Sequence, residues 1–186
     1  MKFIETKLEG VIIIEPDVFK DGRGYFMETW QDHKYRAGGI PGPFVQDNQS
    51  RSVKGTLRGM HAQMKKAQGK LVRAVEGEIY DVVADIRAGS PSYRQWIAVT
   101  LTADNCRQIY VPPGYSHGIC IVSDFASVAY KVTDFYDPSD ELRILWNDPE
   151  LAIEWPFKEP LLSDKDRGGK NLKDIQGLLP VYKKSA

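Results

Sequence analysis

Long hydrophobic runs and an excess of charge of either sign are both missing from this 186-residue sequence. The apolar run near the N-terminus covers only residues 11–14, whereas a signal peptide needs about 7–15 apolar residues and a membrane span about 20. Lys and Arg number 25, and Asp and Glu also number 25, so no net charge attracts a nucleic acid or an anionic membrane. We therefore expect a cytoplasmic protein that binds neither nucleic acid nor membrane.

Cysteine is scarce as well. Cys106 and Cys120 are the only two cysteines, too few for the disulfide frameworks of small secreted domains. We expect both to be reduced and buried, as free cysteine usually is. The chain length suits one domain with a sizeable core, so we expect a single domain over 1–186.

Short runs rich in β-branched and aromatic residues recur between Gly, Pro, Asn and Asp. We expect strands at 10–14, 24–29, 70–75, 78–86, 96–100, 108–111, 118–122 and 127–133. Many strands at this spacing predict an all-β sandwich or barrel. Helical signals are few: one short helix within 28–36, and two short candidates within 161–179, the first with Ser163 as N-cap.

Two histidine segments carry the most specific local pattern. The spacing G-x5-H ends at His61, and P-x-G-x-x-H ends at His117. Both resemble the signature motifs of cupins, which are jelly-roll barrels with an internal pocket. Metal-binding cupins have a second histidine where this chain has Gln63, and a catalytic divalent site normally has three histidine or carboxylate ligands. We therefore expect no metal.

Polar residues surround the first histidine, three of them at alternate positions of one strand-like segment: Arg58, Lys70, Gln46, Asn48 and Ser50. Alternate residues of a strand share one face. The set therefore predicts a pocket for a charged, hydroxylated ligand. A solvated outward face is the alternative for 46–50, and a hydrogen-bonded core residue is the alternative for His117.

The most informative segments are DGRGYFME (21–28), VQDNQS (45–50), KGTLRGMH (54–61), QGKLVR (68–73), GEIYDV (77–82), PPGYSHG (112–118), YKVTDFY (130–136), WNDP (146–149) and LSDKD (162–166). In these segments the sequence resembles a known family, the dTDP-4-dehydrorhamnose 3,5-epimerases of deoxysugar biosynthesis. The resemblance implies a cupin-type jelly roll. It also implies a homodimer that binds a nucleoside-diphosphate 4-keto-6-deoxyhexose without a cofactor, in a pathway such as lipopolysaccharide O-antigen synthesis.

The same resemblance implies the roles of individual residues. His61 would be the general base, paired with Asp166, and Tyr130 would be the acid on the opposite face of the sugar. Lys70 would stabilise the enolate oxygen. The implied substrate-binding residues are Gln46, Asn48, Arg58, His117 and Tyr136, together with Arg23, Phe26 and Glu28 reaching from the partner subunit.

The chemistry explains why these residue types are needed. A C4 ketone acidifies the C–H bonds at C3 and C5, and a nearby cation stabilises the enolate that forms. Histidine titrates near neutral pH and can take the proton, while a carboxylate on its other nitrogen fixes the tautomer. Inversion needs a second acid across the ring, and a tyrosine hydroxyl can supply it. Tyr130 and Tyr136 are the candidates.

Two positions depart from the family's pattern: Ala62 follows His61 where an aromatic is common, and Ile119 ends a G-Y-S-H-G-I segment that commonly reads G-F-A-H-G-F. These departures leave open a CDP-linked sugar, or inversion at C3 alone. A deoxysugar ketoisomerase is a rival interpretation, and so is a cupin that binds a sugar nucleotide without turnover. A base with its orienting carboxylate, a cation and an opposed acid together favour the epimerase, because a binding protein needs none of them.

Overall fold

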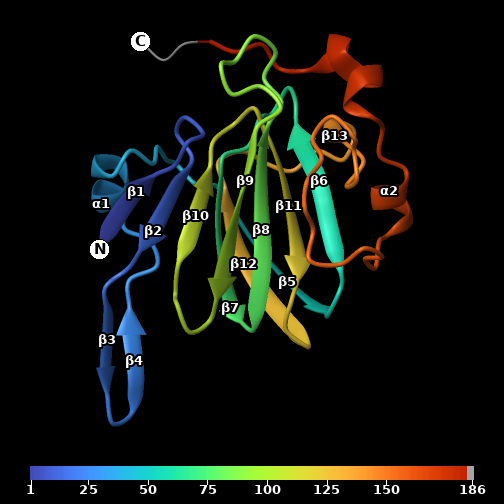
Figure 1. Cartoon of the computed structure of the whole chain (residues 1–186). Helices are drawn as coiled ribbons and strands as arrows, with labels where there is room; N and C mark the ends of the chain where they lie inside the picture. The colour runs from blue at the N-terminus through green and yellow to red at the C-terminus, as the bar shows by residue number, and fades with distance from the viewer. Residues whose placement is uncertain (184–186) are drawn as a thin grey trace.

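Two antiparallel sheets face each other in the computed structural model, which describes residues 1–183, and together they form a jelly-roll barrel (Figure 1). The first sheet has the order β1 (Lys2–Glu5), β2 (Ile12–Glu15), β10 (Gln108–Val111), β7 (Lys70–Glu76), β12 (Phe125–Val132) and β5 (Gln46–Val53). The second has the order β13 (Glu141–Arg143), β6 (Leu57–Gln63), β11 (Tyr115–Ile121), β8 (Glu78–Asp85) and β9 (Trp96–Thr102). The prediction of an all-β jelly roll is confirmed.

Apolar side chains from both sheets fill much of the space between them. Alternation decides which residues reach it, because successive side chains of a strand point to opposite faces. On β7, Val72 and Ala74 lie in this core, whereas Leu71 lies in a separate cluster on the outer face of the first sheet. Strand β8 is buried on both faces, because the C-terminal segment covers its outer side.

The helix α1 (Asp32–Ala37) covers part of the outer face of the first sheet, where Tyr35 packs beside residues of β2 and β10. The helix begins inside the expected range of 28–36, four residues after its start, and ends one residue beyond it. Gln31 is the N-cap, and its side chain accepts a hydrogen bond from the Lys34 amide at 2.6 Å. The Thr29 carbonyl accepts from the Tyr35 hydroxyl instead of from a helical amide, so this stretch stays outside the helix.

The C-terminal segment runs along the second sheet, close to β6 (Figure 1). Isolated parallel bridges attach it to the barrel at Leu161, Lys170 and Val181. It contains the helix α2 (Asp164–Arg167), with Ser163 as N-cap as predicted, and a 3-10 helix, η1 (Leu172–Leu178). No helix within residues 1–183 is long and apolar enough to cross a membrane.

One strand boundary matters for the site. β11 begins at Tyr115 rather than near Gly118, so His117 lies inside a strand and not in the loop before it. The turn is completed earlier than expected because Gly114 takes a φ of 92°, which glycine adopts readily.

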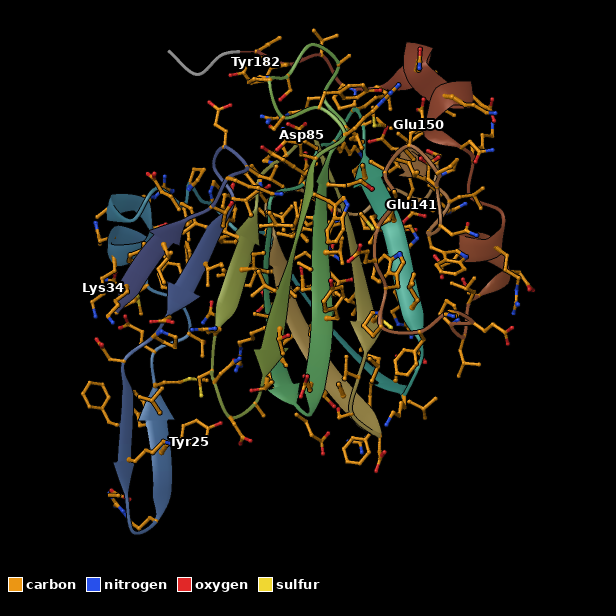
Figure 2. The ribbon with its side chains drawn as sticks, in the orientation of Figure 1. Tyr25, Lys34, Asp85, Glu141, Glu150 and Tyr182 are labelled. Atoms are coloured by element: carbon orange, nitrogen blue, oxygen red, sulfur yellow. The ribbon has the colours of Figure 1, made fainter. Side chains whose placement is uncertain are left out.

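A hairpin made of β3 (Val18–Asp21) and β4 (Gly24–Met27) projects away from the barrel (Figure 1). Its aromatic side chains are exposed, with Phe26 71% exposed and Phe19 64%. Figure 2 shows Tyr25 on this projecting arm. A lone two-stranded hairpin buries too little surface to be stable in isolation, and these aromatic side chains stay more than half exposed in the described chain.

Candidate active site

A cavity of about 350 Å³ lies between the two sheets, beside β5, β6 and α2, a size within the roughly 300–1,000 Å³ of small-molecule sites. Strand β5 supplies a polar wall, because Gln46, Asn48 and Ser50 all line the cavity. Asp47, between the first two, forms an ion pair at 2.8 Å with Lys131 on the adjacent strand. The three polar side chains therefore face inward, and the alternative of a solvated outward face is wrong.

His61 reaches the cavity from β6, with 27% of its side chain exposed. Its Nε2 lies 2.6 Å from Oδ1 of Asp166, which comes from α2. Burial by itself would raise the pKa of Asp166, but hydrogen bonds from His61 and Ser163 outweigh it and hold the pKa below its usual value. An ionised carboxylate at Nε2 keeps the proton on that nitrogen and leaves the Nδ1 lone pair free to act as a base.

A β-bulge in β6 brings Arg58 to the same side of the sheet as His61. Residues three apart on a regular strand point to opposite faces. Between His61 and Arg58, however, the paired strand β11 advances by only two residues, so β6 carries one extra residue. Gly59 lies in this stretch, and a Cβ there would sit 2.5 Å from the Cα of Gly118. The close approach of two glycines thus lets Arg58 and His61 line one cavity.

A second histidine–carboxylate pair lies next to the first, on neighbouring strands. His117 of β11 is the Cα partner of His61, and its Nε2 lies 2.9 and 3.0 Å from the two carboxylate oxygens of Asp81 on β8. The Asp81 side chain is fully buried, and 11% of the His117 side chain is exposed. His117 is therefore both a hydrogen-bonded core residue and a residue that lines the cavity.

Lys70 lines the cavity from β7, in the first sheet. Burial lowers the pKa of Lys70 to about 8, and the carboxylates of Glu141 and Asp81 offset part of this effect. A cation in a largely buried cavity attracts an anion more strongly than it would in water, because the surrounding dielectric constant is lower. Lys70 can therefore stabilise negative charge that develops on a bound ligand.

Tyr130 lies on the wall opposite to His61. It belongs to β12 of the first sheet, whereas His61 belongs to β6 of the second, and both line the same cavity. Burial raises the pKa of Tyr130, and the charge of nearby Arg58 offsets only part of the rise, so the hydroxyl is protonated at neutral pH. A base on one wall and a weak acid on the other can remove and return protons on opposite faces of a ring.

Strand β13 adds a charged pair beside His61. Oε1 of Glu141 lies 4.0 Å from Nδ1 of His61, and Oε2 accepts a hydrogen bond from Arg143 at 2.6 Å. Figure 2 shows Glu141 next to β6. Burial raises the pKa of Tyr136, the next largest effect being the charge of Glu141, and this exposed tyrosine also lines the cavity.

Gln63 has a structural role in the loop that precedes β13. Its Nε2 donates to the Asp137 carbonyl and its Oε1 accepts from the Asp137 amide, each at 2.9 Å. Across the described part of the chain, no group of three or more His, Cys, Asp or Glu side chains is arranged to hold a metal ion. Gln63 therefore has both polar atoms of its side chain engaged with the Asp137 backbone.

The sequence model of dTDP-4-dehydrorhamnose 3,5-epimerases matches residues 5–174. The chain belongs to the dTDP-4-dehydrorhamnose 3,5-epimerase family. It is 49% identical over 176 residues to the dTDP-4-dehydrorhamnose 3,5-epimerase of Pseudomonas aeruginosa, covering 94% of this chain and 97% of that protein.

Solved structures of family members have the same fold. The dTDP-6-deoxy-D-glucose-3,5-epimerase RmlC of Legionella pneumophila, in complex with dTDP-4-keto-L-rhamnose, matches with a TM-score of 0.95 and 46% identity over 98% of this chain and 99% of that one. ChmJ, a 3'-monoepimerase of Streptomyces bikiniensis in complex with dTDP-quinovose, matches with a TM-score of 0.90 and 34% identity over 95% and 92% of the two chains.

Most of the site residues expected from the sequence come together in this cavity, but three do not. Gln46, Asn48, Arg58, His61, Lys70, His117, Tyr130, Tyr136 and Asp166 all line it. Arg23 and Phe26 lie on the projecting hairpin, where Arg23 is paired with Asp21 at 2.6 Å. Glu28 is paired with Lys34 at 2.9 Å. A single chain therefore does not bring these three residues to the cavity.

Four lining or supporting residues were not predicted from the sequence: Asp81, Glu141, Arg143 and Lys165. Asp81 had a usable signal, since a carboxylate inside an otherwise apolar strand needs a buried partner. Glu141 and Arg143 had none, because β13 has only three residues and reaches the cavity through its pairing with β6.

Proposed function

We propose that the protein is a metal-free 3,5-epimerase of a dTDP-4-keto-6-deoxyhexose in deoxysugar biosynthesis. The observation that carries the proposal is the opposition of the His61–Asp166 pair and Tyr130 across one cavity that also holds Lys70. The three relatives that match this chain so closely are named for this reaction or for its single-centre form.

In the proposed first step, Nδ1 of His61 takes the proton from C3 or C5 of the sugar. The C–H bonding electrons move into the ring and onto the C4 oxygen, which becomes an enolate. Lys70 stabilises that oxygen by its charge. Asp166 stabilises the imidazolium that forms at His61, because its carboxylate stays ionised.

In the second step, the Tyr130 hydroxyl gives a proton to the same carbon from the opposite face, and the electron pair returns to form the new C–H bond. The ketone is restored and the centre is inverted. His61 then loses its proton to solvent, and Tyr130 regains one from solvent, so each inversion exchanges the carbon-bound hydrogen with water.

Other lining residues would hold the substrate. The Arg58 guanidinium donates to the Ser52 hydroxyl at 3.0 and 3.2 Å, and a diphosphate can replace this neutral partner because charged acceptors bind a guanidinium more strongly. Gln46, Asn48 and His117 offer polar contacts to the sugar, and Tyr136 offers an aromatic face to the nucleobase.

We assign Arg23, Phe26 and Glu28 to the nucleotide site of a partner subunit in a homodimer. The projecting hairpin with its exposed aromatic rings supports this assignment, because it extends away from the cavity of its own chain (Figure 1). Cytoplasmic location and a product used for lipopolysaccharide O-antigen belong to the same proposal.

Mixing two inactive variants tests the shared site. His61→Asn keeps the hairpin, and Arg23→Ala/Phe26→Ala keeps the base. If the hairpin completes the partner's cavity, co-refolded mixed dimers regain turnover that neither parent has. Mixtures that stay inactive while forming dimers would place Arg23 and Phe26 outside the partner's site.

Incubation in heavy water tests the function. We expect the protein to incorporate deuterium at both C3 and C5 of dTDP-4-keto-6-deoxyglucose, measured by NMR of the sugar. The CDP-linked sugar serves as the comparison. Exchange at C3 alone would make it a single-centre epimerase. Label at neither carbon, with folded protein and intact substrate, would leave only a binding protein.

A further inference from the structure

Ser163 makes two hydrogen bonds to Asp166, the carboxylate that orients His61. Its hydroxyl donates to Oδ2 of Asp166 at 2.6 Å and accepts from the Asp166 amide at 3.2 Å. Asp166 thus has one oxygen on the histidine and the other on the serine. A hydrogen-bonded chain runs from Ser163 through Asp166 to the ring that takes the substrate proton in the proposed function.

Asp166 needs this support because of where it stands. It lies in a helix of four residues, which has little stability of its own. It is 5% exposed, so its second carboxylate oxygen cannot be satisfied freely by water. The backbone amide of Gly59 also hydrogen-bonds to this carboxylate. Without the Ser163 hydroxyl the carboxylate has one fixed partner fewer, and its hydrogen bond to the histidine loses alignment more readily.

We infer that Ser163 is a positioning residue for the epimerisation, fixing the Asp166 carboxylate so that its Oδ1 faces Nε2 of His61. The inference rests on the proposed role of His61 as the base. Ser163 acts through Asp166. Its contribution is therefore to the proton-transfer step and not to the affinity for the nucleotide.

Three substitutions distinguish the contact of the Ser163 hydroxyl with Asp166 from the role of Ser163 as the helix N-cap. Ser163→Ala removes both the hydroxyl and the preferred N-cap residue, and Ser163→Thr keeps both. Ser163→Gly removes the hydroxyl while remaining a tolerable N-cap. Ser139→Ala is the matched control, because Ser139 is also exposed and donates to an aspartate, Asp137, at 2.6 Å outside the cavity.

We expect Ser163→Ala and Ser163→Gly to lower kcat about tenfold, the low end for loss of one hydrogen bond to a charged group, with KM unchanged. Ser163→Thr and Ser139→Ala should keep the wild-type kcat. In an Asp166→Ala background, Ser163→Ala should cause no further loss, because both changes break the same chain. Recovery of kcat in Ser163→Gly, or an additive loss in the Asp166→Ala background, would overturn the inference.

A measurement without substrate keeps this test independent of the proposed reaction. The proton between His61 Nε2 and Asp166 should give a low-field resonance in the proton NMR spectrum of the ligand-free protein, assigned by its loss in His61→Asn. We expect the resonance to broaden in Ser163→Ala and to persist in Ser163→Thr and Ser139→Ala. An unchanged resonance in Ser163→Ala would contradict the positioning role even if the enzyme acted on another sugar.

Discussion

The two histidine–aspartate pairs of the cavity come from different parts of the fold. His117 and Asp81 lie on adjacent strands of one sheet, and Asp81 contacts the ring nitrogen with both oxygens. His61 lies on the same sheet, but its partner Asp166 is 105 residues away in the chain and belongs to a four-residue helix outside the barrel.

This difference separates a fixed group from a reactive one. His117 is the less exposed of the two histidines, and its carboxylate is buried in the barrel. His61 is more than twice as exposed, at 27% against 11% of the side chain, and its carboxylate uses only one oxygen for the ring. The strand pair is suited to holding a substrate group in place, and the pair completed by the C-terminal segment is suited to gaining and losing a proton.

The largest effect should come from replacing the histidines one at a time. We expect His61→Asn to lower turnover by about 10²–10⁴-fold, the usual contribution of a general base, and to retain dTDP binding by calorimetry. His117→Asn removes a positioning contact instead and should lower turnover about tenfold. A His61→Asn enzyme within about threefold of wild type would exclude His61 as the base.

Replacing the two carboxylates should give the same order of effects as replacing the two histidines, with smaller losses of turnover. Asp166→Asn places an amide against Nε2 of His61, and an amide that donates there moves the ring proton to Nδ1, where it blocks the base. We expect a loss of about 10²-fold in kcat, the lower end for a general base, with the folded fraction checked by circular dichroism. Asp81→Asn should lower kcat less than Asp166→Asn does. The reverse order would make His117 the proton acceptor.

The pH dependence should distinguish the two pairs through Lys70. Since burial lowers the pKa of Lys70 to about 8, the cation that stabilises the enolate is lost as pH rises through this value. We expect kcat/KM to fall on the alkaline side near pH 8. Asp81 offsets part of the lowering, so Asp81→Asn should move this limb to lower pH. An alkaline limb that stays in Lys70→Met would belong to another group.

The same shift predicts the sign of a stability change. The pKa of Lys70 is lower in the folded chain than its ordinary value of 10.5, so between about 8 and 10.5 the unfolded chain binds more protons. Stability contributed by this group therefore rises with pH across that window. Urea midpoints measured from pH 7.5 to 10 should show a smaller rise in Lys70→Met than in the wild type.

The sequence predicts features that depend on one strand or one turn, but it does not predict how the two pairs are brought together. Alternation along a strand is local, so the inward face of Gln46, Asn48 and Ser50 was predictable, and so was the placement of Ser163 as N-cap. The partner of His117 needs only the register of neighbouring strands, but no local rule fixes that register before the barrel is known.

Other features of the site depend on tertiary structure alone. The bulge that turns Arg58 toward the cavity arises from the contact between Gly59 and Gly118, which come from different strands. Asp166 reaches His61 only after the C-terminal segment docks along the barrel. The pairing of Asp166 with His61 was predicted from the family resemblance, because no periodicity in the sequence indicates it.

The smallest expected effect concerns the residue beside each histidine. Ala62 follows His61 and has no polar side-chain atom, whereas Ser116 precedes His117, is fully buried, and has a hydroxyl with no hydrogen-bond partner among the described residues. An unsatisfied buried hydroxyl costs about 1–3 kcal/mol. Ser116→Ala, which makes the second histidine's neighbour like the first's, should therefore raise the free energy of unfolding by about 1 kcal/mol.

Urea denaturation and steady-state rates measure this last change together. Ser127→Ala is the matched control, because Ser127 is also buried in a strand but donates to Glu76 at 2.9 Å, so its loss should lower stability. Activity should stay at the wild-type level in Ser116→Ala, since the Ser116 side chain points to the opposite face of β11 from His117. If Ser116→Ala were less stable than the wild type, the Ser116 hydroxyl would have a hydrogen-bond partner in the folded protein, and the prediction would be wrong.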